Sequence, residues 1–432
     1  MRPPPRLYLR ARRLAAEALE GRVTGGPSSL SFLGSTSFLA LLTLGYAVYA
    51  TDRTVLSAVL APMSSALSLS GPQIGLLSAA QYIGVTCVVF AAGFLSDRLG
   101  RWPVMIAGVA VFTAFTWLIG LSTSFGEAFA FRFVSGLGEG AFWPVAMASV
   151  ADHFRGRKGL ALGIFYVGFD AGSVAGLSIG GVAYSLSSSW RPAFFVAPVM
   201  GLLVLAGALL LRHRLAAAGR GAGRVVLGRD ALSLLRRRGV VVIMAFALLA
   251  TWAGVWQVVF LPYYFYKVMH FTVLSSALLS ALVTVAGGFG KVLIGGFSDY
   301  LGRNRILTLV TLATLVSYAL FFFAPLGFTF ELAVALAMGF FNAAIFPVTQ
   351  SLMSDTAVSS AQQNGGPTGS ALGLSTSTQS VATIFSPMIA ASLFAFGVGR
   401  AVALDAMVPI ALALMLTLFL REPRPRRDLL RG

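Results

Sequence analysis

The chain has 432 residues, of which 57% are hydrophobic and 11% are charged, and its mean hydropathy is +0.83. A soluble protein of this length needs far more charged residues to cover its surface. The composition therefore excludes a soluble protein. The formal net charge of +17 would suit a protein that binds nucleic acid, but the positions of the basic residues point elsewhere.

Apolar segments long enough to cross a bilayer recur along the whole chain. A helix needs about 20 residues to span the hydrocarbon core, and twelve segments reach that length. The predicted spans are 37–63, 72–96, 102–122, 126–151, 158–184, 192–212, 239–266, 272–298, 304–325, 328–353, 369–397 and 401–421. The sequence therefore predicts an all-α, polytopic membrane protein. The basic, proline-rich first 30 residues lack the apolar core of a cleavable signal peptide.

The basic residues are concentrated on one side of the predicted membrane. Twelve spans place both ends of the chain on the same side, and the tails and connections there carry 26 of the 32 Lys and Arg residues. The opposite side carries Arg191, Lys267 and Arg400. By the positive-inside rule this distribution predicts a cell-membrane protein with both termini in the cytoplasm. Topology thus accounts for the charge, and no nucleic-acid partner is expected.

The chain contains an internal repeat. "LLSAAQYIGVTCVVFAAGFLSDRLGR" (76–101) aligns without gaps with "LLSALVTVAGGFGKVLIGGFSDYLGR" (278–303). Further on, 136–152 aligns with 339–355, which places Asn342 where the first half has Glu139. Two six-helix bundles of one ancestry are therefore predicted. The predicted parts are a tail at 1–36, a bundle at 37–212, a basic linker at 213–238, a second bundle at 239–421 and a tail at 422–432.

Two turns of this repeat resemble the signature of the major facilitator superfamily. They are "GFLSDRLGR" (93–101) and its echo "GGFSDYLGR" (295–303). The resemblance covers nearly the whole chain and implies two bundles around a central cavity, with spans 1, 4, 7 and 10 lining it. It also implies that the two turns form a cytoplasmic latch that controls conformation. The latch residues would be Gly93, Asp97, Arg98, Gly100, Arg101, Asp299, Gly302 and Arg303.

Few charges remain inside the predicted spans. They are Asp52, Arg53, Arg132, Glu139, Asp170 and Lys291, whereas Asp405 is expected close enough to an outer end to be wetted. A charge at the centre of a span costs about 2.5–3.5 kcal/mol on insertion scales. Buried ion pairs contribute little stability in return, because desolvation offsets much of the attraction. A functional role is therefore predicted for these six residues.

Helix geometry limits how four of these charges can pair. Arg132 and Glu139 are two turns apart and share one helix face. Asp52 and Arg53 point about 100° apart, so at least one of them must reach another helix or a wet cavity. The alternative to a functional role is that Asp52–Arg132 and Arg53–Glu139 are ion pairs that only hold the first bundle together.

Two further motifs narrow the resemblance. "YATDRTVLSAVLAPM" (49–63) and "RFVSGLGEGAFWP" (132–144) resemble spans 1 and 4 of the anion:cation symporter branch, which includes bacterial sugar-acid importers and vesicular glutamate and sialic acid carriers. Spinster-type transporters look similar at the same positions. The resemblance implies that Arg53 and Arg132 hold a substrate carboxylate, and that Asp52 and Glu139 bind and release the coupling proton.

The remaining site residues are expected around these two motifs. In related carboxylate carriers span 8 often supplies a further cation, here Lys291, whose alternative is a side chain that snorkels to the cytoplasmic end. Asp170 lies at a position of span 5 where the sugar-acid importers tend to have a neutral polar group. An acid there suggests either a second proton site or part of a site for a zwitterion. The expected polar lining is Gln81, Gln257, Gln379 and Asn342.

The residues and the resemblance together predict proton-coupled symport of a small organic anion by alternating access, by a monomer without a cofactor. Burial favours the protonated form of a carboxylate and a nearby Arg favours the ionised form, so proton and anion binding reinforce each other. The alternatives are a proton-coupled exporter of drugs or amphipathic lipids and a transporter-like sensor.

Residues 172–181 have the glycine spacing of a drug:proton antiporter signature, but Leu177 stands where that signature has Pro. Close helix packing is the simpler explanation of these glycines. The spans contain neither a nucleophile–base pair nor a metal-binding cluster, so an enzyme is not expected.

Overall fold

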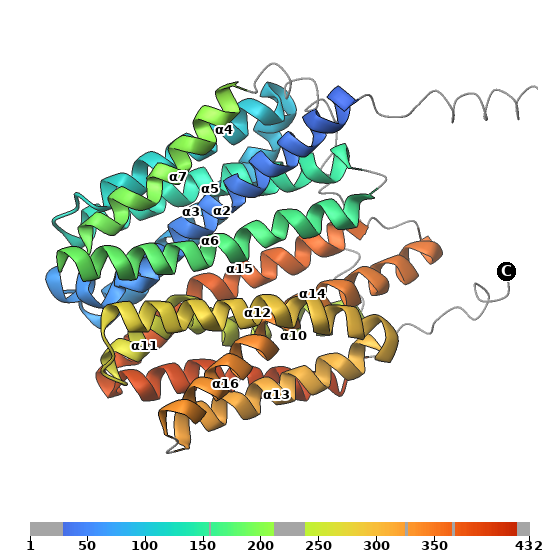
Figure 1. Ribbon diagram of the computed structural model, residues 1–432. Coiled ribbons are helices and arrows are strands. Elements are labelled where there is room, and N and C mark those ends of the chain that lie inside the picture. The colour runs from blue at the N-terminus through green and yellow to red at the C-terminus, as the bar shows by residue number, and fades with distance from the viewer. Residues whose placement is uncertain (1–28, 155–156, 211–237, 325–326, 365–367, 421–432) are drawn as a thin grey trace, which may run out of the picture.

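The structure is a computed structural model that describes residues 29–154, 157–210, 238–324, 327–364 and 368–420. All regular elements in these ranges are helices, and they form two bundles packed side by side (Figure 1). The predicted all-α class is thereby confirmed. The predicted tails and linker lie largely outside the described residues.

Each bundle is built from six helical segments, two of which are divided into shorter pieces in the second bundle. The first bundle consists of α2 (Ser29–Ala66), α3 (Gly71–Leu99), α4 (Arg101–Ile119), α5 (Phe125–His153), α6 (Lys158–Ser187) and α7 (Arg191–Leu210). The second consists of α10 (Arg238–Val259), α11 (Leu261–Lys267), α12 (Val273–Leu301), α13 (Arg303–Phe323), α14 (Phe328–Asn364), α15 (Thr368–Ser392), the 3-10 turn η2 (Leu393–Phe396) and α16 (Val398–Thr417). The predicted seventh span is divided into α10 and α11, and Pro262, which lacks a backbone N–H, stands at the start of α11.

The two ends of the molecule are distinguished by the chain. Helix α2 begins and α16 ends at the same end, on the right of Figure 1, which we call the terminal end. The opposite end, where α2 runs into α3, is called the distal end.

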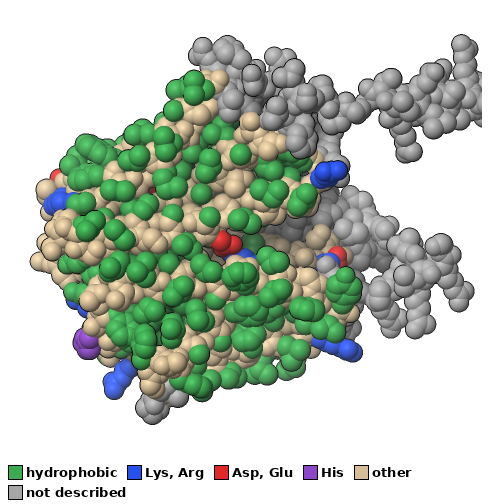
Figure 2. Space-filling view, viewed as in Figure 1, with side chains coloured by type: hydrophobic (Ala, Val, Ile, Leu, Met, Phe, Trp, Pro, Cys, Tyr) green, Lys and Arg blue, Asp and Glu red, His purple; other side chains and the backbone are tan. Residues whose placement is uncertain are grey.

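Ten helices in the described residues are long and apolar enough to cross a membrane. Helices α2, with 38 residues, and α5, with 29 residues, are also long enough but are not among them, and they hold Asp52 and Arg53, and Arg132 and Glu139. Figure 2 shows apolar side chains spread over both bundles, with most charged side chains toward the edges of the face. The two polar helices therefore differ in composition, and not in length, from the others.

The glycines of α6 let it approach α2 closely. A Cβ atom on Gly172 would lie 2.0 Å from the carbonyl oxygen of Ala47, and one on Gly176 would lie 2.6 Å from that of Thr51. The Thr51 hydroxyl donates a hydrogen bond to the Gly172 carbonyl at 3.0 Å. Close packing is thus what these glycines provide, as the sequence predicted.

The two signature turns have the same geometry in both bundles. Gly100 and Gly302 have φ of +89° and +92°, a region that L-residues with a side chain rarely adopt. The helix that follows each glycine begins with an arginine that pairs with an aspartate, Arg101 with Asp152 at 2.7 Å and Arg303 with Asp355 at 2.6 Å. The side chains of Asp97 and Asp299 lie outside the described residues. The repeat is therefore visible in three dimensions, and the latch role of the turns stays a prediction.

The bundles meet along the distal half of the molecule. Cβ atoms on Gly71 and Gly75 of α3 would lie 2.4 Å from the Ala391 carbonyl oxygen and 2.6 Å from that of Pro387, both on α15. Gly93, nearer the terminal end of the same α3, has nothing within 4 Å of its Cβ position. The contacts between bundles therefore close the distal end.

Candidate functional site

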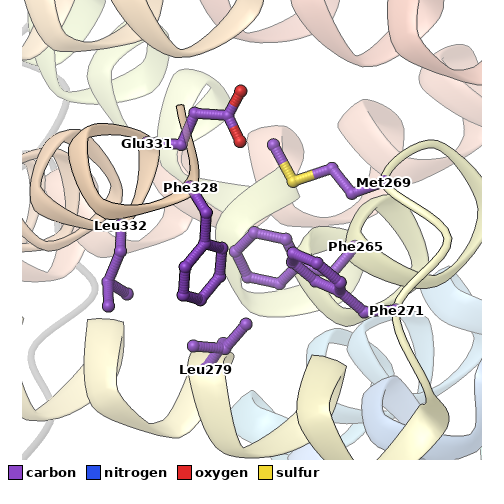
Figure 3. Close-up of a pocket in the computed structure, with 7 residues that line it drawn as sticks. All are labelled: Phe265, Met269, Phe271, Leu279, Phe328, Glu331 and Leu332. Atoms are coloured by element: carbon purple, nitrogen blue, oxygen red, sulfur yellow. The ribbon is translucent and has the colours of Figure 1, made fainter. Parts of the chain in front are cut away.

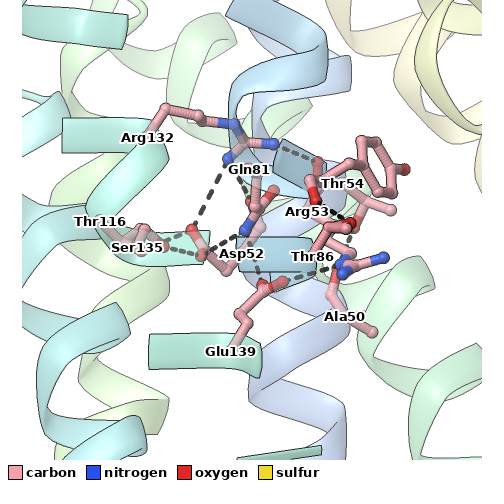
Figure 4. A network of polar contacts seen from close by, with 11 residues as sticks. Ala50, Asp52, Arg53, Thr54, Gln81, Thr86, Thr116, Arg132, Ser135 and Glu139 are labelled. Atoms are coloured by element: carbon pink, nitrogen blue, oxygen red, sulfur yellow. Dashed lines mark hydrogen bonds and ion pairs between the residues drawn. The ribbon is translucent and has the colours of Figure 1, made fainter. Parts of the chain in front are cut away.

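Gln81 of α3 joins the two buried carboxylates of the first bundle (Figure 4). Its Nε2 donates to Asp52 Oδ2 at 2.8 Å and to Glu139 Oε1 at 2.6 Å. The three side chains come from α2, α3 and α5 and are nearly inaccessible to solvent. Gln81 Oε1 is buried and has no hydrogen-bond partner. Both N–H groups of the amide therefore donate to carboxylates, and its oxygen remains available as an acceptor.

Hydroxyl groups complete the surroundings of Asp52. Thr116 of α4 donates to Oδ1, and Ser135 of α5 donates to Oδ2, each at 2.5 Å. Arg132 Nη1 lies 3.8 Å from Oδ1. Asp52 thus sits among one cation and three neutral donors.

Arg132 is bound mainly to the backbone of α2. Its Nη1 donates to the carbonyl oxygen of Asp52 at 2.9 Å, and its Nη2 donates to that of Arg53 at 3.2 Å. The side chain is 3% exposed, and its buried Nε has no partner. In this conformation Arg132 fixes α5 to α2, and the predicted contact with a substrate stays a prediction.

Arg53 is the more accessible arginine. Its Nε donates to Glu139 Oε2 at 2.9 Å, and its side chain is 13% exposed. Its Cζ lies 4.3 Å from the ring centre of Tyr49 and 4.7 Å from that of Tyr82. Within the described residues the terminal nitrogens make no hydrogen bond. Arg53 therefore has donors to offer to a solute.

We call the seven side chains of this cluster the intramembrane network. They are Asp52, Arg53, Gln81, Thr116, Arg132, Ser135 and Glu139. Two arginines and two carboxylates balance in charge when both carboxylates are ionised, so protonation of one carboxylate would leave one excess positive charge.

Asp170 and Lys291 lie apart from this network, where the two bundles meet. Lys291 Nζ of α12 lies 2.5 Å from Asp170 Oδ1 of α6, and the side chains are 32% and 24% exposed. Figure 2 shows an acidic and a basic patch side by side midway along the apolar face. The cation predicted for the substrate site is thus engaged by the predicted third acid, in an ion pair between bundles.

The predicted polar residues of the second bundle are spread over three helices. Gln379 Oε1 of α15 accepts from Thr251 at 3.1 Å, and Asn342 of α14 donates to the Tyr318 hydroxyl at 3.0 Å. Gln257 Nε2 of α10 is buried without a partner. The structure does not gather these three amides into one cluster.

The expectation that Asp405 is wetted is wrong. Asp405 is 5% exposed, and its carboxylate accepts from Trp252 Nε1 at 2.7 Å and from the Ser386 hydroxyl at 2.8 Å. It lies seven residues into α16, about 10 Å from the helix start at 1.5 Å per residue. Packing against α10 and α15 therefore removes it from water.

Sequence reasoning missed several members of the site. Thr116 and Ser135 carry no distinct signal, because hydroxyls in helices commonly bond the carbonyl four residues earlier, as Thr116 also does to Phe112. A signal did exist for Tyr49, one helical turn before Arg53 on the same face. Tyr82 comes from another helix, so only the fold reveals its contact with Arg53.

A small pocket at the distal end of the second bundle lies away from the intramembrane network (Figure 3). It is lined by Phe265, Met269, Phe271, Leu279, Phe328, Glu331 and Leu332. Its wall is apolar apart from one carboxylate, so it has no donors for an anion.

Known proteins resemble the chain at different levels. Protein spinster of Drosophila melanogaster is 27% identical over 189 residues, which are 43% of this chain and 31% of that protein. A probable 4-methylmuconolactone transporter of Cupriavidus pinatubonensis is 24% identical over 324 residues, 72% of this chain and 74% of that protein. The match to the Drosophila protein thus spans less than a third of its length.

Solved structures share the fold. A bacterial homologue of the human lysosomal transporter Spinster, in an inward-facing and unoccupied conformation, superposes with a TM-score of 0.72 at 17% identity, over 89% of this chain and 95% of that one. The Major Facilitator Superfamily model matches residues 42–366. With two six-helix bundles, a repeated signature turn and a family match over most of its length, the chain belongs to the Major Facilitator Superfamily.

Proposed function

We propose that the protein is a secondary active transporter that carries a small organic anion together with protons by alternating access. The terminal end is the cytoplasmic end in this proposal, because the tails and connections there hold 26 of the 32 basic residues. The distal contacts between bundles then correspond to a conformation closed toward the outside. One relative is named as a probable transporter of a small organic compound, 4-methylmuconolactone, which supports this class of solute.

The single observation that carries the proposal is the state of Arg53. Glu139 accepts a hydrogen bond from its Nε, and among the residues that the structure describes the terminal nitrogens have no hydrogen-bond partner. Arginine offers a planar fork that binds a carboxylate with two hydrogen bonds. In this proposal Arg53 therefore binds the anion, and the protonation state of Glu139 determines whether the charge of Arg53 is already neutralised.

Glu139 couples the two ligands through this arrangement. Protonation of Glu139 removes its negative charge, weakens the pair with Arg53 and leaves the network with one excess positive charge. A carboxylate on Arg53 restores neutrality, so proton and anion stabilise each other in the site, which is the thermodynamic content of symport.

Gln81 allows the proton to be held without breaking the network. A protonated Glu139 becomes a donor, and Gln81 Oε1 is a buried acceptor without a partner. In this proposal the amide turns so that Oε1 accepts a hydrogen bond from the protonated Glu139, while Thr116 and Ser135 continue to donate to Asp52. Gln81, expected to contact substrate, is better suited to this proton-linked role.

The test is uptake into proteoliposomes with an imposed pH gradient. Sugar acids, dicarboxylates, aromatic acids and amino acids are screened, and protein-free liposomes correct for weak acids that cross as neutral molecules. Wild type is expected to accumulate a carboxylate above equilibrium. Glu139→Gln is expected to keep exchange of internal for external solute and to lose accumulation driven by the gradient.

Two results would contradict this function. One is equal accumulation by wild type and Glu139→Gln under the same gradient, which would remove Glu139 from coupling. The other is unchanged uptake by Arg53→Ala, because a neutral residue there cannot hold a carboxylate.

A second candidate is proton-coupled export of drugs or amphipathic lipids. It is favoured by the matches to Spinster proteins and to a multidrug transporter of Bacillus subtilis, 32% identical over 130 residues. It predicts movement of solute opposite to the proton. The same vesicles distinguish it, since proton-driven loss of a preloaded amphiphile supports export and excludes symport of that solute.

A further inference from the structure

The environment of Arg53 restricts what shape of anion can reach it. Two tyrosine rings, Tyr49 of α2 and Tyr82 of α3, turn their faces to the guanidinium at 4.3 and 4.7 Å. Glu139 occupies its Nε. Two aromatic rings and one carboxylate therefore surround this flat group, and its terminal nitrogens are the donors that a ligand can bind.

A carboxylate bound through those nitrogens lies in the plane of the guanidinium. The atoms next to the carboxylate then extend in the same plane, alongside the two tyrosines. At a planar α-carbon, as in aromatic or conjugated acids, all substituents stay in that plane. At a tetrahedral α-carbon, as in sugar acids, hydroxy acids and amino acids, substituents leave that plane, so the acid is no longer flat beside the aromatic side chains.

We infer that the Arg53 site selects carboxylates with a planar, conjugated α-carbon, and that Tyr49 and Tyr82 determine this selection. The inference rests on the proposed function, whose solute it narrows from organic anions in general to flat ones. Tyr82 is the more accessible of the two rings, because it is half-buried whereas Tyr49 is buried, so Tyr82 is the ring chosen for substitution.

Aromatic side chains continue from Arg53 toward the other cation. The ring centre of Tyr49 lies 6.3 Å from that of the half-buried Phe169, and Lys291 Nζ lies 5.9 Å from the Phe169 ring. The flat part of a bound acid therefore has a further aromatic surface beside it. Lys291 is held by Asp170, so a single carboxylate at Arg53 is sufficient for binding.

The test compares two acids of similar size, benzoate and cyclohexanecarboxylate, by calorimetric binding to the purified full-length protein. Both are single carboxylates on six-membered rings, and the second is the more hydrophobic, so a preference for benzoate cannot come from apolar burial. We expect benzoate to bind about tenfold more tightly. Sorbate and hexanoate form a second pair with the same contrast at the α-carbon.

Two variants of Tyr82 distinguish the contribution of its aromatic ring from that of its hydroxyl group. Tyr82→Phe is expected to keep the preference, and Tyr82→Leu to reduce it to about twofold or less, because the aromatic face is lost. Tyr300→Leu, at an exposed tyrosine on α12, is the control and is expected to change nothing.

The outcomes distinguish this inference from the function on which it rests. Equal affinity of wild type for the two acids, or full preference in Tyr82→Leu, overturns the selection by the rings and leaves anion transport standing. Absence of binding of any carboxylate, or binding that survives Arg53→Ala, overturns both.

Discussion

Asp52 and Asp405 show how the same side chain is accommodated differently in the two bundles. Asp52 lies within 3.8 Å of Arg132 and accepts hydrogen bonds from three neutral groups. Asp405 has Trp252 and Ser386 as donors, and within the described residues it has no cationic partner. Asp52 therefore belongs to a charge-balanced network, whereas Asp405 depends on hydrogen bonds alone.

This contrast predicts how Asp405 responds to substitution. Asp405→Asn keeps an oxygen for Trp252 Nε1 and gains an N–H donor for the Ser386 hydroxyl, so we expect about 1 kcal/mol or less of destabilisation. Asp405→Leu leaves Trp252 Nε1 unpaired in a buried place and leaves the Ser386 hydroxyl only the Trp252 carbonyl oxygen at 3.4 Å, so it should cost about 2–4 kcal/mol. Unfolding in detergent micelles, followed by tryptophan fluorescence, measures the difference. Equal losses for the two variants would mean that the hydrogen bonds do not stabilise this site.

Single residues were predictable where a charge stood in an apolar run. Asp52, Arg53, Arg132 and Glu139 were identified in this way, and the alternative pairings Asp52–Arg132 and Arg53–Glu139 are the contacts that the structure contains. The burial of Asp405 was not predictable, because distance from a helix end does not tell which neighbours cover a side chain. The roles of Thr116 and Tyr82 depend equally on contacts between helices that the sequence does not encode locally.

Among the elements, α6 and α12 are joined by an ion pair between the two bundles. Asp170 and Lys291 are partly exposed on an apolar face, where an unpaired charge is costly. Their attraction therefore favours the arrangement in which α6 and α12 lie together. Helices were predictable as elements from apolar runs, but this pairing was not, because the two residues are 121 positions apart in the chain.

A charge exchange tests the pair. Asp170→Ala and Lys291→Ala each leave one charge alone and should cost about 2–3 kcal/mol. The double variant Asp170→Lys with Lys291→Asp restores opposite charges and is expected to recover at least half of that loss. Thermal unfolding of the four proteins in lipid nanodiscs shows how much of the lost stability the charge exchange recovers. A double variant no more stable than either single variant would show that the pair does not join the bundles.

At the scale of the whole molecule, the two bundles repeat a backbone but not its chemistry. The repeat places Asn342 in the second bundle where the first has Glu139, and Asn342 donates to the Tyr318 hydroxyl at 3.0 Å. Trp256 is fully buried, with its ring centre 5.6 Å from that of Tyr318 in an edge-on contact. Aromatic packing thus fills in the second bundle the place that ionisable groups hold in the first. In the proposed mechanism, the ionisable groups that couple proton and anion therefore lie in the first bundle, and the second bundle supplies the surface against which the first bundle moves.

Such movement requires the distal contacts to open, and a cross-link can prevent this. A Cβ atom on Gly181 of α6 would lie 2.8 Å from that of Ala277 of α12, about 1 Å closer than in a disulfide, so a small shift accommodates the bond. We predict that Gly181→Cys with Ala277→Cys, in a Cys87→Ser background, forms a disulfide on oxidation. Uptake into proteoliposomes should then fall to the protein-free level and return on reduction, while each single cysteine variant transports in both conditions. Full transport by the cross-linked protein would show that the solute does not pass between the distal ends of α6 and α12, because a covalent bond there holds the two bundles together throughout the cycle.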